Sequence, residues 1–171
     1  NKNINLCAGV DIDSNARERF LEKFESSIPV YSSIEKMLVE HKPDIISLCV
    51  SPKILPDLVK ECIKVNAPKL FFLEKPLALD TNSIKILKNN IRNIPIAVNY
   101  HRCWDPAHEK FFIKVKNSGP TLAIRVLYNN GLFNYGSHVI ALLLLHYGKV
   151  NRVTLLDSDI RIRNKVINPG F

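Results

Sequence analysis

The residues of this sequence with the clearest capacity for chemistry are Glu74 and Lys75, a carboxylate and an amine followed directly by Pro76. They come after the apolar run Leu70–Leu73, which predicts a buried strand. Proline disfavours helical geometry in the residue before it, so Lys75 is expected at a corner. Ligands bind at the carboxyl edge of open parallel sheets, so this lysine is predicted to face a cleft. A lysine that merely pairs locally with Glu74 is the alternative interpretation.

A second candidate is Asp11, which follows the apolar run at residues 6–10. In dinucleotide-binding folds an acidic residue at the end of the second strand holds the ribose hydroxyls. A turn-forming or helix-capping aspartate is the alternative. The sequence contains no G-x-G-x-x-G turn. The first strand of such a fold is therefore expected to be missing from this chain, which would open on the second strand.

Short apolar runs alternate with amphipathic stretches along most of the chain, and this alternation is typical of repeated βα units. Strands are predicted at residues 6–10, 30–31, 45–50, 69–73 and 94–99. Helices are predicted between them, with a further one at residues 106–116. The fold class predicted is α/β, with a Rossmann-type parallel sheet covered by helices on both faces and joined by right-handed crossovers.

The pattern changes after the break at residues 117–120. A long strand is predicted at residues 121–128, an apolar helix at 135–147, and strands at 150–156 and 160–166. We therefore expect a Rossmann-like domain at residues 1–119 and a shortened, partial α+β domain at 120–171.

Composition excludes several classes of protein. The 171 residues, of which 46% are apolar, suffice for one domain or slightly more. The net charge of +8 is scattered along the chain, so we predict no nucleic-acid binding. A solvated basic surface is the favoured interpretation of this charge, and a charged cleft for a phosphorylated cofactor or nucleotide sugar would draw on the same charge. The apolar stretch at residues 139–145 is far shorter than the roughly 20 residues of a membrane span. We expect a cytoplasmic protein without a membrane segment or signal peptide.

The four cysteines, Cys7, Cys49, Cys62 and Cys103, form no C-x-x-C pair. They are predicted to be reduced residues of the core. The histidines show no metal-ligand spacing, so no metal site is predicted.

Several short motifs occur in a fixed order: AGVDID at residues 8–13, VYSSIE at 30–35, PDII at 43–46, VSP at 50–52 and EKPLA at 74–78. Two later segments, NYHRCWDP at 99–106 and GSH at 136–138, are similar to an N-x-R-R-F-x-P segment and to the end of a D-x-G-x-H helix start. Over residues 6–148 the chain resembles the glucose-fructose oxidoreductase and inositol dehydrogenase family, Gfo/Idh/MocA.

The resemblance implies an NAD(P)-dependent oxidoreductase that transfers a hydride between nicotinamide and a carbinol carbon of a sugar, cyclitol or sugar nucleotide. A role in the synthesis of polysaccharide sugars is the pathway that the resemblance suggests. Lys75 matches the family's active-site lysine, which hydrogen-bonds the reacting oxygen, and His138 matches its catalytic histidine. A helix-start histidine that is hydrogen-bonded locally is the alternative for His138. The family's aspartate four residues earlier is replaced by Asn134, an amide that can position a hydroxyl group but cannot act as a base.

The resemblance also implies two sets of binding residues. Those for the cofactor are Asp11, Ile12, Ser51, Pro52, Glu74 and Lys75. Those for the substrate are Lys75, Asn99, Arg102, Trp104, Asn134 and His138. The carboxylate of Asp11 would disfavour a 2′-phosphate, so NAD is the predicted cofactor, and the nearby Arg17 keeps NADP open. Ser51 and Pro52 could equally form an ordinary helix entry, and Trp104 a core residue between domains.

Self-association through the sheet of the second domain is expected from the family. The missing glycine-rich turn and the short second region have two explanations: the sequence omits segments of a longer protein, or the chain is a degenerate relative. The second explanation gives an alternative function, a catalytically silent protein that binds a sugar nucleotide or a partner subunit.

Overall fold

The computed structural model describes residues 4–129 and 131–154, and its first part is a series of βα units. The strands are β1 (Gly9–Val10), β2 (Val30–Tyr31), β3 (Ile45–Leu48), β4 (Leu70–Leu73) and β5 (Ile96–Val98). The helices between them are α1 (Ser14–Lys23), α2 (Ile34–His41), α3 (Leu55–Asn66) and α4 (Thr81–Ile91). Every strand pair is parallel, in one sheet of order β1-β2 and another of order β3-β4-β5. The predicted α/β class with Rossmann-like parallel strands is confirmed.

Helix boundaries follow from local side-chain chemistry. Asp13, Ser33 and Asp80 each cap a helix by accepting a hydrogen bond from a backbone N–H of its first turn. Such a cap satisfies a donor that has no partner within the helix. At the other end of α2, Lys42 adopts the left-handed conformation with φ of 45° and donates its N–H to Leu38 O. Helix α2 therefore ends a few residues before β3 begins.

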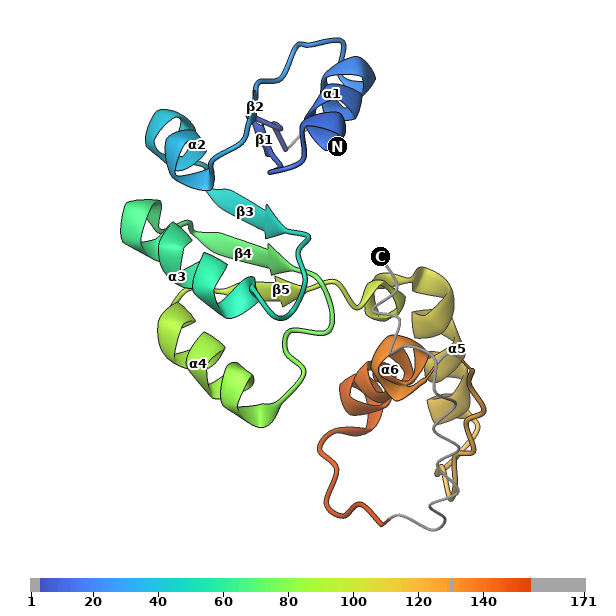
Figure 1. Ribbon diagram of the computed structural model, residues 1–171. Coiled ribbons are helices and arrows are strands. Elements are labelled where there is room, and N and C mark those ends of the chain that lie inside the picture. Colours follow the sequence, from blue (N-terminus) through green and yellow to red (C-terminus); the bar gives the residue numbers. More distant parts are fainter. Residues whose placement is uncertain (1–3, 130, 155–171) are drawn as a thin grey trace. The chain divides into compact units, whose positions relative to one another are not determined.

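The core lies where α2, α3 and α4 pack with the three-stranded sheet, and Figure 1 shows α3 and α4 beside β3 and β4. Strand β4 is central in that sheet, and its residues Phe71 and Leu73 are fully buried. From the helices, Leu38, Val59 and Cys62 are also fully buried. This packing fixes the positions at which the three strands end.

Glycine at position 9 allows α1 to pack closely on β1. A Cβ atom built there would lie 2.8 Å from Phe20 Cζ, well inside normal contact distance. The ring of Phe20 also packs on Phe24, with ring centroids 4.7 Å apart. The helix is thereby held against the strand that leads to Asp11.

Three predictions about the first part of the chain were wrong in detail. Only Gly9 and Val10 of residues 6–10 form a strand, because β1 pairs with a partner of only two residues. The strand predicted at residues 45–50 ends at Leu48, and its alternating burial turns Ile45 outward. The same alternation exposes Cys49, although it was expected in the core. Of the four free thiols only Cys62 is fully buried, and burial raises its pKa to about 12.

The chain divides into two units, Asn1–Val98 and Asn99–Phe171. The second contains a 3₁₀ turn, η1 (His101–Trp104), helix α5 (Pro106–Asn117), a π turn, η2 (Leu132–Gly136), and helix α6 (Ser137–Tyr147). Gly148, with φ of 85°, ends α6. None of the helices in the described ranges is long and apolar enough to cross a membrane.

The strand predicted at residues 121–128 is not formed. Its alternating sequence suits a strand, but no segment within the described ranges pairs with it, and a strand needs a hydrogen-bonded neighbour. Leu122 and Leu127 are accordingly 94% and 82% exposed. Residues 150–154 also form no strand, and the rest of the predicted strands at 150–156 and 160–166 lies outside the described residues.

Helices α5 and α6 pack against each other through a ring stack that contains a titratable histidine. His146 of α6 stacks on Phe112 of α5 with centroids 3.9 Å apart and planes at 16°. Burial, and then the charge of Lys116, lower the pKa of His146 below its usual 6.5, while Glu109 opposes them. Protonation of His146 is therefore easier in the unfolded chain than in the folded one.

We expect the second unit to lose stability as the pH falls from 7.5 through 6.5 toward the lower pKa of folded His146, because the unfolded state binds more protons in that window. The His146→Phe variant keeps a stacking ring but cannot titrate. Thermal unfolding across this pH range should show a steeper decline for the wild type than for the variant. Parallel declines would contradict the expected linkage.

Candidate functional site

Lys75 lies just beyond the carboxyl end of β4. The strand register aligns Leu48, Leu73 and Val98, the last residues of three parallel strands. The backbone N–H of Glu74 donates to Leu48 O at 3.3 Å, so the ladder continues one residue past β4. Lys75 follows at the predicted corner, half-buried and joined to Pro76 by a cis peptide bond. The residue therefore lies at the carboxyl edge of the sheet, the edge at which parallel folds bind ligands.

The turn after β3 is built as a helix entry. Ser51 Oγ accepts a hydrogen bond from the N–H of Lys53, and Ser51 O accepts from the N–H groups of Ile54 and Leu55. Pro52 is buried. These contacts match the ordinary structural role considered for this turn, and its contact with a dinucleotide stays a prediction.

Asp11 and Arg17 meet at the carboxyl end of β1. The N–H of Asp11 donates to Tyr31 O at 3.0 Å, and Asp11 Oδ1 accepts from the N–H of Asp13 at 2.9 Å. Arg17 Nη1 donates to the carbonyl oxygens of Asp11 and Ile12, at 2.8 and 3.0 Å. The Ile12 side chain itself is 91% exposed. An accepting carboxylate and a guanidinium thus lie on one exposed strand end.

In the second unit, His138 is the second residue of α6 and is only 5% exposed. Two rings from the segment that follows β5 pack edge-on against it. The centroid of His101 lies 4.6 Å from that of His138 with planes at 60°, and the centroid of Tyr100 lies 5.7 Å away with planes at 89°. The tertiary fold therefore brings the 99–104 segment to the start of α6.

The other predicted substrate residues of this unit differ in their surroundings. The guanidinium of Arg102 lies over the ring of Tyr135, 5.3 Å from its centroid, a cation–π contact. Asn99 directly follows β5 and is half-buried, while Trp104 is 67% exposed. Arg102 is thus held by an aromatic partner within its own unit.

The predicted helix start at Tyr135 needs correction, because a wider π turn precedes α6. The N–H of Gly136 donates to Gly131 O at 3.2 Å, five residues back. Ser137 Oγ donates to Phe133 O and Asn134 O, which holds the turn against α6. Asn134 is exposed whereas His138 is buried, so their four-residue spacing does not give them the same environment.

Close packing explains the glycine in this turn. A Cβ atom at Gly136 would lie 2.9 Å from Leu132 Cδ1 and 3.0 Å from the ring of Tyr128. A larger residue would push on both neighbours, so glycine lets the π turn close immediately before His138.

Sequence reasoning missed the rings that pack on His138 and Arg102, namely Tyr100, His101 and Tyr135. His101 was considered only as a metal ligand and set aside. The signal that could have found it is the position of Tyr100 and His101 inside the 99–106 motif, between two predicted substrate residues. Among the residues of the described ranges, no cluster of His, Cys, Asp and Glu suits a metal ion.

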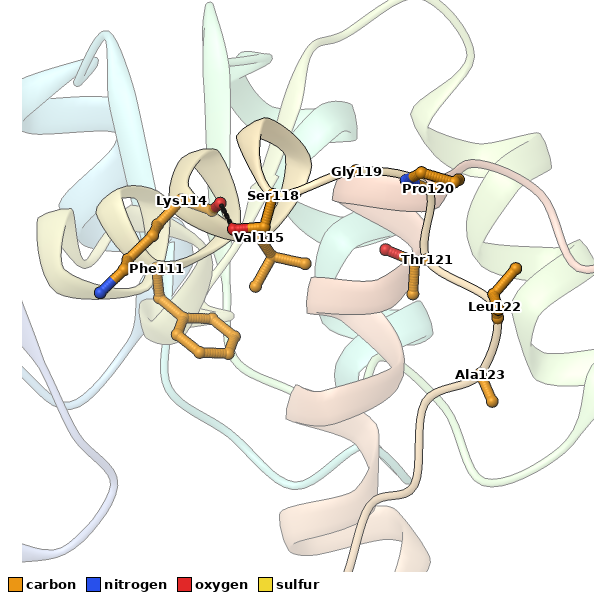
Figure 2. Close-up of a pocket in the computed structure, with 9 residues that line it drawn as sticks. All are labelled: Phe111, Lys114, Val115, Ser118, Gly119, Pro120, Thr121, Leu122 and Ala123. Carbon is orange, nitrogen blue, oxygen red and sulfur yellow. Dashed lines mark hydrogen bonds between the residues drawn. The ribbon is translucent and has the colours of Figure 1, made fainter.

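A hollow of about 520 Å³ in the second unit is a different feature. Its lining comes from α5 and the extended segment after it, as Figure 2 shows: Phe111, Lys114, Val115, Ser118, Gly119, Pro120, Thr121, Leu122 and Ala123. Ser118 Oγ donates a hydrogen bond to Lys114 O at 2.9 Å. None of the predicted site residues lines this hollow, so it is not the candidate active site.

Comparison with known proteins gives a family for most of this architecture. The family model described as an oxidoreductase family with an NAD-binding Rossmann fold, GFO_IDH_MocA, matches residues 1–94, more than half of the chain. No curated protein matches the sequence.

Solved structures share the fold at low sequence identity. A myo-inositol 2-dehydrogenase from Lactobacillus plantarum is 23% identical with a TM-score of 0.57, over 67% of this chain and 34% of that one. A scyllo-inositol dehydrogenase from Lactobacillus casei with NAD(H) and scyllo-inositol is 16% identical with a TM-score of 0.56, over 67% and 34%.

A 3-ketoreductase from Actinomadura kijaniata, in complex with TDP-benzene and NADP, is 16% identical with a TM-score of 0.64, over 84% of this chain and 48% of that one. This chain therefore spans between about a third and a half of the length of these structures.

Proposed function

Because this chain belongs to the Gfo/Idh/MocA oxidoreductase family, with its NAD-binding Rossmann fold, we propose that it acts in an NAD(P)-dependent dehydrogenase or reductase. The reaction proposed is hydride transfer between nicotinamide and a carbinol carbon of a sugar, cyclitol or sugar nucleotide. The observation that carries this proposal is Lys75, held at the carboxyl edge of the parallel sheet directly after β4.

The polar groups at the end of β1 fit the ribose of a dinucleotide. The Asp11 carboxylate can accept hydrogen bonds from ribose hydroxyls, and one of its oxygens is already oriented by the N–H of Asp13. Its negative charge opposes a 2′-phosphate. Arg17 is bonded to the neighbouring carbonyl groups and lies close enough to the same loop to favour that phosphate. We propose NAD as the cofactor. NADP is the alternative, because Arg17 could bind its 2′-phosphate.

The remaining roles are assigned by the chemistry of the side chains. A bound nicotinamide supplies or accepts the hydride. Lys75 donates a hydrogen bond to the reacting oxygen of the substrate and so orients its carbinol carbon. His138 takes the hydroxyl proton in the oxidising direction and returns it in the reducing direction, as imidazoles do near neutral pH. Asn99, Arg102, Trp104 and Asn134 are proposed to contact the substrate.

The substrate class is supported by the names of the structural neighbours, which are inositol dehydrogenases and a 3-ketoreductase crystallised with a TDP compound. A role in the synthesis of polysaccharide sugars, a cytoplasmic location and self-association through the second unit belong to the same proposal. Light scattering of the full-length protein would test the self-association.

Asn134 favours a second candidate, a catalytically silent relative that binds a sugar nucleotide or a partner subunit. An amide at that position cannot exchange protons as the family's aspartate can, and it lies exposed while His138 is buried.

One experiment separates the two candidates. Full-length protein is titrated into NADH and NADPH while nicotinamide fluorescence is recorded, and turnover is then screened against cyclitols and nucleotide sugars. The enzyme proposal expects enhanced fluorescence together with turnover of at least one substrate. Nucleotide-sugar binding without nicotinamide binding would support the silent relative and reject the enzyme.

A further inference from the structure

His138 poses a problem of access. As a group that exchanges a proton with substrate it must reach solvent or ligand, yet it is only 5% exposed. The side chains that cover it therefore decide when and in which orientation its imidazole can act. Two of these lie in one short segment at the start of η1, Tyr100 and His101.

Both rings meet the imidazole edge-on. His101 is the nearer, with ring centroids 4.6 Å apart and planes at 60°, and Tyr100 is nearly perpendicular at 89°. Aromatic rings favour such tilted and perpendicular arrangements. Contact with two rings restricts rotation of the His138 ring about its side-chain bonds.

The two covering residues differ in their own exposure. Tyr100 is half-buried, and that burial raises its pKa, so it stays a neutral phenol. The Tyr100 carbonyl oxygen accepts a hydrogen bond from the N–H of Cys103 at 2.8 Å, and this bond stabilises η1. His101 is exposed although its ring packs on that of His138, so it is in contact with both the buried imidazole and solvent.

A charged residue, Asp105, directly follows η1. Asp105 caps α5 through the N–H of Ala107, and this bond is the main cause of its lowered pKa. His108, whose Nδ1 lies 3.2 Å from Asp105 Oδ2, and then His101 add smaller effects in the same direction. Asp105 therefore places a negative charge in the segment that directly follows η1.

We propose that His101 is a positioning residue for His138. The His101 ring shields the His138 imidazole from solvent and, together with Tyr100, fixes its orientation. The kinetic consequence rests on the proposed function, because it assumes that His138 exchanges a proton with substrate. The closure itself does not depend on any activity.

The closure is tested by labelling the histidines of the full-length protein with diethyl pyrocarbonate and mapping the products by peptide mass spectrometry. His138 should react slowly in the wild type. His101→Ala should raise its rate by about tenfold, the order expected when one ring contact that holds a closed state is removed. His101→Phe should keep it slow. An unchanged rate in His101→Ala, or a fast rate in His101→Phe, would overturn the proposal.

His108→Ala is the matched control, since His108 is a neighbouring histidine of the same segment that pairs with Asp105. It should leave the His138 rate unchanged, and an equal increase there would overturn the specific role of His101. His101→Asn provides a second variant without a ring if His101→Ala does not fold, as judged by its circular dichroism, and the same increase is expected.

The positioning role is tested by kinetics in the active protein. His101→Ala should lower kcat by about tenfold with little change in KM, because a loosely held imidazole reaches its reactive orientation less often. His101→Phe should restore most of kcat. Equal kcat in all three proteins would overturn the role. If the wild type itself shows no turnover, the proposed function fails, while labelling still decides whether His101 closes the site.

Discussion

Lys75→Ala is expected to lower kcat by about 10³-fold, within the range that one positioned proton-transfer or hydrogen-bonding group contributes. Lys75 lies just past the end of β4, at the sheet edge where we propose that the substrate binds, and alanine there can neither donate to the reacting oxygen nor hold it in place. Affinity for the nicotinamide cofactor should change little, because the ribose contacts proposed at Asp11 stay intact. Steady-state kinetics and a fluorescence titration of the same preparation measure both quantities.

Lys69→Ala is the matched control. Lys69 directly precedes β4 and so lies at the amino edge of the sheet, where it pairs with Asp44 at 2.8 Å. Both side chains are well exposed, so loss of the pair should cost little stability. Its kcat should equal that of the wild type. If Lys75→Ala keeps full turnover, or if both variants lose it equally, Lys75 has no special role in the reaction.

Asp11→Ser is expected to raise the ratio of NADP affinity to NAD affinity by about ten- to a hundredfold, since a hydrogen bond to a charged group is worth about 1.5–3 kcal/mol. Serine still accepts from a ribose hydroxyl but no longer repels a 2′-phosphate. Arg17, bonded to the Asp11 and Ile12 carbonyl groups, then favours that phosphate. Dissociation constants for both oxidised cofactors give the ratio.

Two further variants isolate the cause of that shift. Asp13→Asn removes a charge two residues away while an amide oxygen can still cap α1, and it should leave the ratio near that of the wild type. Adding Arg17→Ala to Asp11→Ser should cancel most of the gain for NADP. A full shift in Asp13→Asn would mean that net charge, and not the position of Asp11, sets the preference.

Several features of this protein could be predicted from the chain alone because their causes are local. Period-two and helical patterns of apolar residues identify the βα units, and Asp13 and Asp80 cap their helices through N–H groups only two or three residues away. Proline after Lys75 predicts a corner, and the corner is present. These features depend on residues within a few positions of one another.

Other features depend on partners far apart in the chain. Residues 121–128 have the alternation of a strand, yet no strand forms, because the pattern cannot supply a hydrogen-bonded neighbour. The π turn before α6 depends on the approach of Tyr128 and Leu132 to Gly136, and only the folded backbone shows that closeness.

The chemistry of the site divides in the same way. Residue type and position at a strand end identify Asp11 and Lys75, since the carboxyl edge of a parallel sheet is defined once the strands are known. Folding in three dimensions places Tyr100 and His101 on His138, and the Arg102 guanidinium over a ring. Such contacts between rings arise from packing among segments that are distant in sequence, and the periodicity of a single segment carries no information about them.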